Sequence, residues 1–445
     1  MSGPNDHIDR MVDLVRNNEI PVFIRRAHDF EPADLADVLA ALDEDERVAV
    51  VQALPAELSS QALAEMPEDA HAEATLAALD PARAGEIVEE LDDDDAADIL
   101  RDMDPADQER ILSTVEHRAD VDRLLRYEPE TAGGLMTSHL VTVRDTATVE
   151  EALEAIRRQA EEVEEFYQVF VVDGDRRLVG ILPFKDLVVS RPDRRIRDFM
   201  ADADITVTPD LDQEQVARLM ARYNLPSVGV VDENGRLLGR VTFDDVIDVV
   251  EAEQTEDLLK FGGVSADEEL GAGWTEAVRS RLPWLYVNLL TAFLAGGVVY
   301  LFQDTVHRTV ALAVWMPIIA GMGGNAGTQA LAVTVRRLAL GLIPAHLFMR
   351  VVGKEVLVGL TNGLAIGLVV GAIAAFLGEQ PVLGLVVFLA MTVNLLVAGF
   401  AGAFIPILLE RFKVDPAIAS SIFVTTFTDV CGFLLLLGLA GMLLL

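Results

Sequence analysis

The chain has 445 residues and a formal net charge of −37 at pH 7, and 51% of its residues are hydrophobic. This acidity excludes nucleic acid as a partner, because binding to phosphates requires a positive surface. The length allows several domains. The single cysteine, Cys431, excludes an intrachain disulfide framework.

Most of the charge lies in the first 270 residues, since only nine Lys and Arg and seven Asp and Glu follow them. Carboxylates suit divalent cations, but the chain also has only four lysines. Few lysines and many aspartates are typical of proteins that work in molar salt, where surface charges are screened. Overall acidity therefore does not indicate a function, and only acids at particular positions do. The N-terminus lacks the apolar segment of a signal peptide, so we expect it in the cytoplasm.

Residues 1–130 contain a repeat whose units begin 12 or 13 residues apart, each with a helix-capping residue or a proline. A pair of short helices in about every 24 residues predicts a small α-solenoid. The acidic run Asp92–Asp95 opens one of these helices, and a preference for negative charge at helix N-termini explains only one or two of its acids. The units begin at Glu31, Asp43, Pro55, Pro67, Asp80, Asp92 and Asp104.

Residues 131–250 contain two copies of a second repeat, 131–199 and 200–250. The segment DGDRRLVGILPFKDLV (173–188) matches DENGRLLGRVTFDDVI (232–247) at an offset of 59. Each copy predicts strand, helix, strand, glycine turn, strand and helix, and the two copies together predict a paired α/β module. Thr242 and Asp245 have the spacing of a capping box, which we favour over contact with a nucleotide ribose.

An acidic connecting helix is predicted at residues 244–263, ending at two glycines. Its acids stand at helical spacings that bring like charges together, as in Asp244/Asp248, Asp248/Glu251, Glu253/Glu256 and Glu253/Asp257. Each such pair disfavours the helix by a few tenths of a kcal/mol. A bridging cation or high salt relieves the repulsion, and a solvated linker helix is the alternative interpretation.

Five apolar runs follow residue 280, each long enough to cross a membrane as a helix. Arginine and lysine gather before the first run and in the loops after the second and fourth, which predicts cytoplasmic N-terminal domains and an outside C-terminus. We expect this five-helix transmembrane domain to cover residues 280–445. The runs are 282–302, 309–335, 356–377, 382–409 and 417–445.

Two features of these runs predict an ion path. The second run contains Gly321, Gly323, Gly324 and Gly327 around Asn325. This density of glycine weakens a helix and frees carbonyls, which membranes tolerate only beside protein or water. The adjacent amides and hydroxyl favour a pore lining over close helix packing. Thr328 and Gln329 complete this set.

The second feature is Asp429, an acid with no charged neighbour nearby in the fifth run. An intramembrane acid is costly and indicates a functional site. Thr425, Thr426 and Thr428 place hydroxyls within a turn of it, and the sequence offers no intramembrane cation as a partner. A bound cation is therefore predicted, and a protonated structural aspartate is the alternative.

This order of segments resembles the MgtE family of magnesium channels. An acidic helical superhelix, the segment ETAGGLMT, a cystathionine-β-synthase-type (CBS) repeat pair, an acidic helix and five spans follow one another. The spans carry GGNAGTQ and DPAIASSIFVTTFTD. The resemblance implies a multi-pass protein of the cell membrane that takes up Mg²⁺ and is not an enzyme. It also implies a homodimer with its pore on the two-fold axis, and it leaves open an adenine nucleotide such as ATP at the CBS pair, at Thr242 and Asp245.

The resemblance further implies that Asp429 holds Mg²⁺ in the pore and that cytoplasmic Mg²⁺ closes it by joining the N domain, the CBS pair and the connecting "plug" helix. Gln61 and Asn224 stand where the family pattern leads us to expect acids, and Thr328 and Ser421 where it often has asparagine. The implied pore lining is Gly323, Gly324, Asn325, Gly327, Thr328, Gln329, Ser421, Thr425 and Thr428. The implied sensor groups are Asp94, Asp98, the Gly134 carbonyl, Glu214, Asp245, Asp248, Glu253, Glu256 and Asp257.

Three rival functions differ in class. A secondary transporter of Mg²⁺, Co²⁺ or Mn²⁺ would depend on a proton or sodium gradient. An intramembrane metalloprotease lacks its ligands, since none of the seven histidines lies in HExxH. A membrane-bound nucleotide sensor leaves Asp429 and the glycine segment unexplained.

Overall fold

The computed structural model describes residues 4–67, 70–160, 163, 166–264, 273–377, 381–414 and 416–444. The chain divides into two compact units, Met1–Ala252 and Glu253–Leu445. Helix α14 (Phe243–Phe261) contains the boundary between them.

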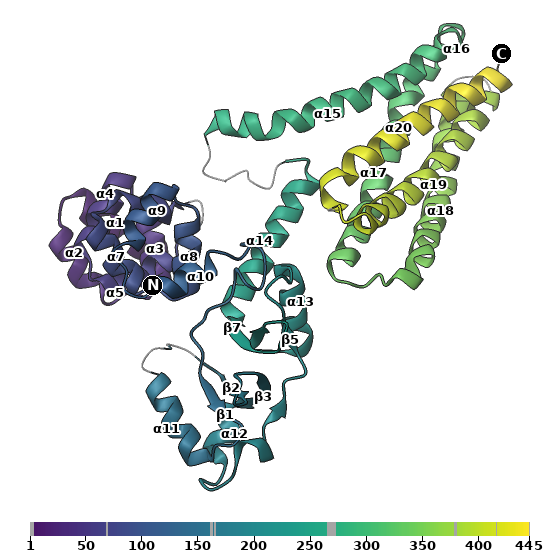
Figure 1. The fold of residues 1–445 in the computed structure, drawn as a ribbon. Helices are drawn as coiled ribbons and strands as arrows, with labels where there is room; N and C mark the ends of the chain where they lie inside the picture. The colour runs from purple at the N-terminus through teal and green to yellow at the C-terminus, as the bar shows by residue number, and fades with distance from the viewer. Residues whose placement is uncertain are drawn as a thin grey trace. The chain divides into compact units, whose positions relative to one another are not determined.

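The first unit begins with a stack of short helices (Figure 1). They start where the sequence offers capping groups: Pro32 follows Glu31 at the start of α3, and Asp80 accepts a hydrogen bond from the Ala82 backbone N–H at the start of α7. The bounds are α1 Pro4–Arg16, α2 Ile20–Ala27, α3 Pro32–Ala40, α4 Glu44–Ala53, α5 Ala56–Ala64, α6 Ala72–Ala78, α7 Pro81–Glu89, α8 Asp93–Arg101, α9 Pro105–Leu112 and α10 Arg118–Leu124.

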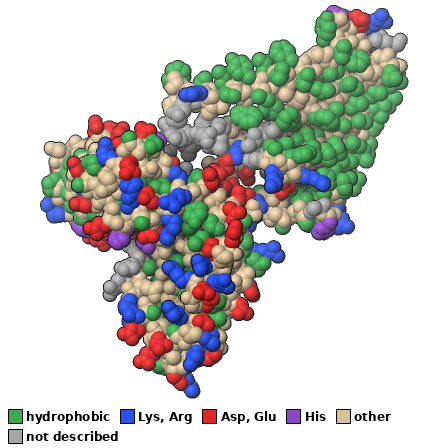
Figure 2. Space-filling view, viewed as in Figure 1, with side chains coloured by type: hydrophobic (Ala, Val, Ile, Leu, Met, Phe, Trp, Pro, Cys, Tyr) green, Lys and Arg blue, Asp and Glu red, His purple; other side chains and the backbone are tan. Residues whose placement is uncertain are grey.

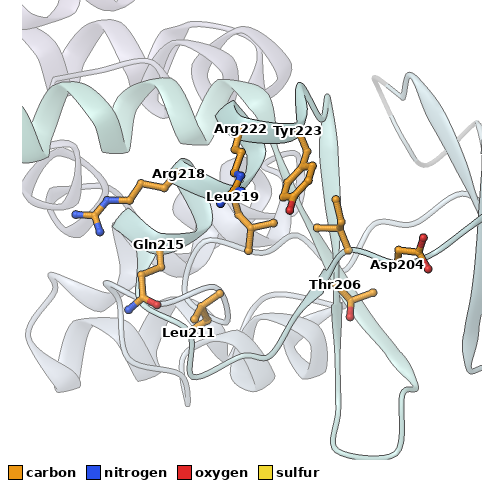
Figure 3. Close-up of a pocket in the computed structure, with 9 residues that line it drawn as sticks. Asp204, Thr206, Leu211, Gln215, Arg218, Leu219, Arg222 and Tyr223 are labelled. Atoms are coloured by element: carbon orange, nitrogen blue, oxygen red, sulfur yellow. The ribbon is translucent and has the colours of Figure 1, made fainter. Parts of the chain in front are cut away.

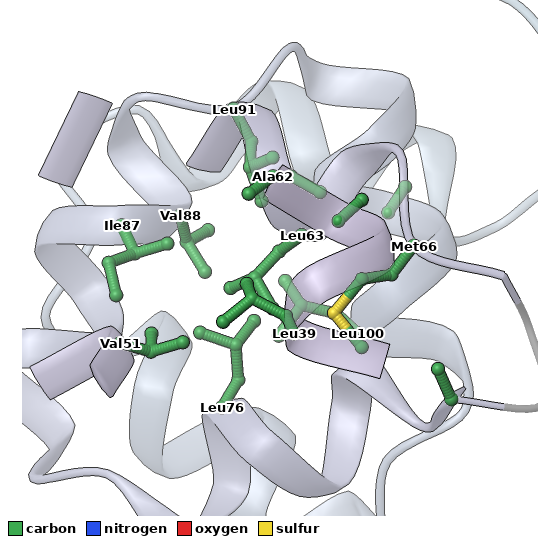
Figure 4. Close-up of a cluster of buried hydrophobic side chains, with 14 of the residues drawn as sticks. Leu39, Val51, Ala62, Leu63, Met66, Leu76, Ile87, Val88, Leu91 and Leu100 are labelled. Carbon is green, nitrogen blue, oxygen red and sulfur yellow. The ribbon is translucent and has the colours of Figure 1, made fainter. Parts of the chain in front are cut away.

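These helices pack in two interleaved series, α3–α5–α7–α9 and α4–α6–α8–α10. Packing of each helix on the second one along the chain is the arrangement of an α-solenoid, as the spacing of the repeats predicted. Buried apolar side chains fill the space between the series, among them Leu39, Leu63, Leu76 and Leu100 (Figure 4).

The second part of this unit contains two small sheets with the same order of strands. β1 (Thr142–Arg144), β2 (Gln168–Val172), β3 (Leu178–Pro183) and β4 (Ala201–Asp202) form one sheet, and β5 (Thr206–Val207), β6 (Ser227–Val231) and β7 (Leu237–Thr242) form the other. In each sheet the first two strands are parallel and the next pair is antiparallel. The helices are α11 (Val149–Gln159), α12 (Phe184–Val189) and α13 (Gln213–Tyr223), with a 3₁₀ turn at Ile196–Asp198.

The two repeats meet through residues that the offset of 59 makes equivalent. Gln168 Nε2 donates to the Ser227 backbone oxygen at 2.8 Å, and a bridge joins Arg177 to Arg236. The predicted paired α/β module is thus confirmed. The inserted segment EEVEEF of the first copy lies mostly outside the described residues.

The connecting helix has the predicted extent. α14 ends at Phe261, and Gly263 has a positive φ of 75°. The Gly263 N–H donates to the Lys260 oxygen and the Val264 N–H to the Leu259 oxygen, each at 3.0 Å. Glycine is needed here because this capping geometry requires a left-handed residue.

The second unit consists of long apolar helices. They are α15 (Trp274–Leu301), α17 (Leu312–Ala339), α18 (Phe348–Leu377), α19 (Pro381–Arg411) and α20 (Pro416–Leu443), with short turns at α16 (Gln303–Arg308) and Ala345–Leu347. Among the described residues, four helices are long and apolar enough to span a membrane, namely α15, α18, α19 and α20. The predicted count of five spans is therefore not confirmed, since α17 is long but its apolar sequence is interrupted by Asn325, Thr328 and Gln329. Apolar side chains are spread along the visible faces of the long helices, and charged side chains gather near their ends (Figure 2).

Helix α17 differs from the expectation in one respect. Its glycines were expected to weaken the helix, yet α17 is unbroken from Leu312 to Ala339. Gly323 and Gly327 are buried, and a Cβ on Gly327 would lie 2.5 Å from Val424 of α20. Packing on neighbouring helices stabilises the helix where intrinsic propensity does not.

Helices α18 and α19 contact each other through their backbones. Gly359, Gly363, Gly367 and Gly371 recur every fourth residue on the buried face of α18. A Cβ on Gly363 would lie 2.7 Å from the Thr392 backbone oxygen, and one on Gly371 would lie 2.8 Å from the Gly384 oxygen. Small residues at this spacing allow the close approach that holds helices together in membranes.

We predict that Gly363→Ala lowers the thermal stability of the protein in detergent, by the equivalent of about 1–3 kcal/mol, because the new methyl group meets backbone that must shift. Gly353→Ala is the matched control, since nothing lies within 4 Å of a Cβ at that position of the same helix. Equal melting temperatures for the two variants would contradict the close backbone contact.

Candidate functional site

Asp93, in the first turn of α8, is a buried carboxylate that contacts the segment leading into the CBS pair. It is 4% exposed, and it accepts hydrogen bonds from Thr137 Oγ1 at 2.6 Å and from the Ser138 N–H at 3.1 Å, as well as from the Ser138 hydroxyl. Thr137 in turn pairs with Arg240 of β7 through backbone hydrogen bonds. This set of hydrogen bonds, here called the Asp93 clamp, joins α8 to the second repeat.

Asp92 makes a similar contact beside the clamp. Its carboxylate lies 3.0 Å from His139 Nδ1, and this hydrogen bond raises the pKa of the histidine. Asp92 and Asp93 therefore both have partners from the segment 137–139.

The next two acids of α8 have no such compensation. Asp94 is 8% exposed, and its Oδ1 finds no hydrogen-bond partner among the described residues. Burial, and then the charges of Asp245 and Asp95, raise its pKa well above the usual range. The same two causes, burial and the charge of Asp245, raise the pKa of Asp95 to about 8.

Asp245 faces these acids from the first turn of α14. Burial raises its pKa to about 6, although hydrogen bonds from Thr242 oppose the shift. Asp94, Asp95 and Asp245, here called the acidic cluster, thus carry like charges in a place that favours their neutral forms. The Asp94 oxygen without a donor is an acceptor that a cation or its bound water would satisfy.

Other predicted sensor residues lie near the cluster or apart from it. Asp98 is exposed and pairs with Arg101, and its charge contributes to the raised pKa values of Asp95 and Asp245. Glu214, at the start of α13, pairs with Arg218. Gly134 is buried, and its N–H donates to the Thr131 oxygen at 2.9 Å.

Along α14 the acids have different surroundings. Burial, followed by the charges of Asp244 and Glu251, raises the pKa of Asp248. Glu256 forms an ion pair with Lys260 one turn later, which offsets part of the expected repulsion. Glu253 and Asp257 also take part in polar interactions.

The described residues contain no group of three or more His, Cys, Asp or Glu side chains placed to hold a metal ion. The acidic cluster is therefore not a cage of ligands. It suits an ion such as Mg²⁺, which keeps several waters and uses one or two carboxylates.

The two residues that replace expected acids differ in their surroundings. Asn224 ends α13 in the left-handed region, with φ 52°, where asparagine is well tolerated. Gln61 lies half-buried in α5, and nothing in its surroundings explains the amide.

Asp429 is half-buried on α20, and no hydrogen bond or ion pair joins it to another described residue. Two of its neighbouring hydroxyls donate within their own helix: Thr425 Oγ1 to the Ser421 oxygen, and Thr428 Oγ1 to the Thr425 oxygen, both at 2.9 Å. These hydroxyls therefore leave only oxygen lone pairs for a further partner, and Asp429 keeps its full capacity as an acceptor.

The predicted pore-lining residues of α17 divide between two faces. Gly323 and Gly327 are buried against α19 and α20, whereas Asn325 and Gln329 are exposed one turn apart. Gly324 and Thr328 are intermediate, and a Cβ on Gly324 would lie 3.9 Å from Thr425 of α20. The structure thus brings the glycine segment beside the helix that carries Asp429.

Thr242 and Asp245 form the capping contact that the sequence favoured, because the Thr242 N–H and hydroxyl both donate to Asp245 Oδ2, at 3.2 and 2.5 Å. A groove of about 520 Å³ lies elsewhere on the second repeat, with Arg218, Arg222, Tyr223 and Asp204 among its lining residues (Figure 3). Neither residue of the proposed nucleotide pair lines this groove.

Sequence reasoning missed the roles of Asp93, Asp95 and His139. The run Asp92–Asp95 signalled that these acids were unusual, but a run does not show which carboxylates find donors. That depends on contacts with residues more than 40 positions away.

Three family models match the chain. They are a divalent cation transporter model at residues 316–439, the MgtE intracellular N domain at 30–130, and the CBS domain at 132–192 and 196–252. Together they match the helical N domain, the two repeats and most of the long apolar helices, including α20 with Asp429.

Curated relatives and solved structures agree with these matches. The magnesium transporter MgtE of Thermus thermophilus is 41% identical over 74% of this chain and 73% of the relative. The magnesium transporter MgtE of Enterococcus faecalis is 37% identical over 74% of this chain and 72% of the relative. The soluble part of a magnesium transporter matches with a TM-score of 0.52 at 29% identity, over 56% of this chain and 99% of the other. The cytosolic domain of the Mg²⁺ channel MgtE in complex with ATP matches with a TM-score of 0.50 at 39% identity. This match covers 53% of this chain and 97% of the other.

The raised pKa values predict how stability depends on pH. An acid whose pKa is raised by folding binds more protons in the folded state, so stability falls as pH rises from about 4 towards the folded-state pKa. For Asp95 this window extends to a pKa of about 8. We predict that Asp95→Asn melts about 2–4 °C above the parent at pH 8 in metal-free buffer, the shift expected for about 1 kcal/mol, and melts with the parent at pH 4.

Asp193→Asn is the control, since it removes one exposed acid from the same unit. Added Mg²⁺ should raise the melting temperature of the parent at pH 8 more than that of Asp95→Asn. A parent whose stability rises between pH 5 and 8 would contradict the repulsion in the acidic cluster.

Proposed function

The chain belongs to the MgtE family of magnesium transporters, and from this we propose that it conducts Mg²⁺ into the cell and closes when cytoplasmic Mg²⁺ binds its acidic residues. Asp429 is the observation that carries the proposal. It is an acid on a membrane-type helix, beside the glycine segment of α17, without a cationic partner among the described residues.

The path is proposed to use the carboxylate of Asp429 as its binding site. A single acid in each subunit binds a hydrated divalent ion through its waters, and such binding is weak enough to allow release. Thr425, one turn earlier, adds a hydroxyl oxygen that keeps its lone pairs, since its proton is donated to the Ser421 oxygen.

Two copies of the chain complete the path. Asn325 and Gln329 are exposed on α17, and amides at membrane depth are costly against lipid. A homodimer with α17 and α20 of both copies around the two-fold axis gives these amides a polar environment. With the first unit in the cytoplasm, the C-terminus lies outside, as the distribution of Lys and Arg among the loops predicts.

Closure is proposed to follow from the acids of α8 and α14. Mg²⁺ at Asp94, Asp98, the Gly134 carbonyl, Glu214, Asp245, Asp248, Glu253, Glu256 and Asp257 would lower the repulsion among them. The ion then favours whichever conformation brings the acids together, by its difference in affinity for the two states. The raised pKa values of Asp94, Asp95 and Asp245 support this step, because groups that bind protons for electrostatic reasons also gain from a divalent cation.

An adenine nucleotide at the CBS pair is proposed as a second regulator. A cytosolic domain of a related Mg²⁺ channel, similar in structure to this chain, is known in complex with ATP. A gradient-coupled transporter of Mg²⁺, Co²⁺ or Mn²⁺ is the second candidate function. Flux that requires a proton or sodium gradient would favour it over a channel.

We predict that Asp429→Asn lowers Mg²⁺ flux into liposomes at least tenfold while the protein still assembles, because the amide keeps the size but loses the charge. Asp304→Asn, the same change at an exposed acid of the same unit, should retain parental flux. Parental flux in Asp429→Asn would remove this residue from the ion path.

We also predict that Asp248→Ala combined with Glu256→Ala keeps flux at internal Mg²⁺ concentrations that stop the parent, because fewer acids remain to be neutralised. The measurement is Mg²⁺ flux across a range of internal Mg²⁺, with and without molar KCl. Inhibition equal to that of the parent would reduce α14 to a linker. Closure of the parent by KCl alone would assign its acids to salt adaptation.

A further inference from the structure

Asn394, in the middle of α19, is a fully buried amide where α17, α19 and α20 meet. Its exposed fraction is 0%. Its Nδ2 donates to the Ile319 backbone oxygen of α17 at 3.0 Å, a hydrogen bond between residues 75 positions apart. Its Oδ1 is buried and finds no hydrogen-bond donor among the described residues.

Both neighbouring helices present glycine where this amide lies. A Cβ on Gly323 of α17 would overlap Nδ2, and a Cβ on Gly432 of α20 would lie 2.9 Å from it. Gly323 lies two residues before Asn325, and Gly432 lies three residues after Asp429. The amide therefore packs against both helices that carry the proposed path, beside the place where Gly323 of α17 lies next to Thr428 of α20.

Stability alone does not account for an amide at this position. A buried amide with one unsatisfied atom is less favourable than an apolar side chain of similar volume, and exchanging such a group for an apolar one is often neutral or stabilising. Valine is only somewhat larger than asparagine and would fill the junction without an unsatisfied oxygen. The amide is thus better explained by a role in positioning the neighbouring helices than by a contribution to the stability of the fold.

We infer that Asn394 is a positioning residue that sets the spacing of α17 against α20, and with it the selection of Mg²⁺ over monovalent cations. The inference rests on the proposed function, since it concerns the width of the path beside Asp429. Selection of a hydrated divalent ion depends on that width, because a wider path lets monovalent cations pass without contact with the Asp429 carboxylate.

The test uses the full-length protein in liposomes, with influx of Mg²⁺ and of K⁺ measured separately. We expect Asn394→Val to fold and to melt close to the parental temperature, while the ratio of Mg²⁺ to K⁺ influx falls about tenfold, the effect of misplacing one hydrogen-bonded group. Thr392→Val is the matched control. Thr392 is buried on the same helix but donates to the Gly363 oxygen of α18 at 3.1 Å, away from the path, so its ratio should stay parental.

Gly432→Ala tests the same contact from α20, because its methyl group displaces the amide while Asn394 remains, and it should lower the ratio in the same direction. If Asn394→Val does not fold, the Mg²⁺ to K⁺ ratio of Gly432→Ala decides between the two outcomes. An unchanged ratio in the folded Asn394→Val variant, or an equal fall in Thr392→Val, overturns the inference. A parent that carries no Mg²⁺ contradicts the proposed function instead, so the two failures are distinguishable.

Discussion

The hydrogen bonds to Asp93 are the interaction on which the arrangement of the first unit depends. They hold the first turn of α8 on the segment 137–138, and through it on β7 of the second repeat. Asp94 and Asp95 follow directly in the same turn, so the clamp keeps the backbone that carries them near β7, which leads directly into α14 and Asp245. Burial, and then the charges of neighbouring acids, therefore raise the pKa values of these three acids in the folded protein.

This arrangement separates docking from sensing. Asp92 and Asp93 find donors within the protein, so contact between α8 and the second repeat does not require a metal ion. Among the described residues, Asp94 Oδ1 finds no donor, and both Asp94 and Asp95 have raised pKa values, so the energy of that contact responds to protons and cations. A carboxylate with hydrogen-bond donors and one without them thus have opposite roles, although they are neighbours in a single run of four aspartates.

The sequence predicted those features that depend on neighbouring residues or on internal repetition. The spacing of capping residues predicted the solenoid, the offset of 59 predicted the paired module in which Gln168 meets Ser227, and two glycines predicted the end of α14. It did not show that α17 stays helical, because propensity favours a break there and contacts with α19 and α20 decide otherwise. Nor did it single out Asn394, one polar residue in an apolar run, since its significance lies in partners 75 and 38 positions away.

The glycine contacts between α18 and α19 bear on the order in which the membrane helices assemble. These helices are consecutive in the chain, so their contacts close a short loop, whereas contacts between α17 and α20 join residues about a hundred positions apart. Chain entropy opposes the longer closure more than the shorter one. The hairpin of α18 and α19 is thus the part of this unit that can form as soon as residue 411 has entered the bilayer, and it offers a preformed surface on which α17 and then α20 pack.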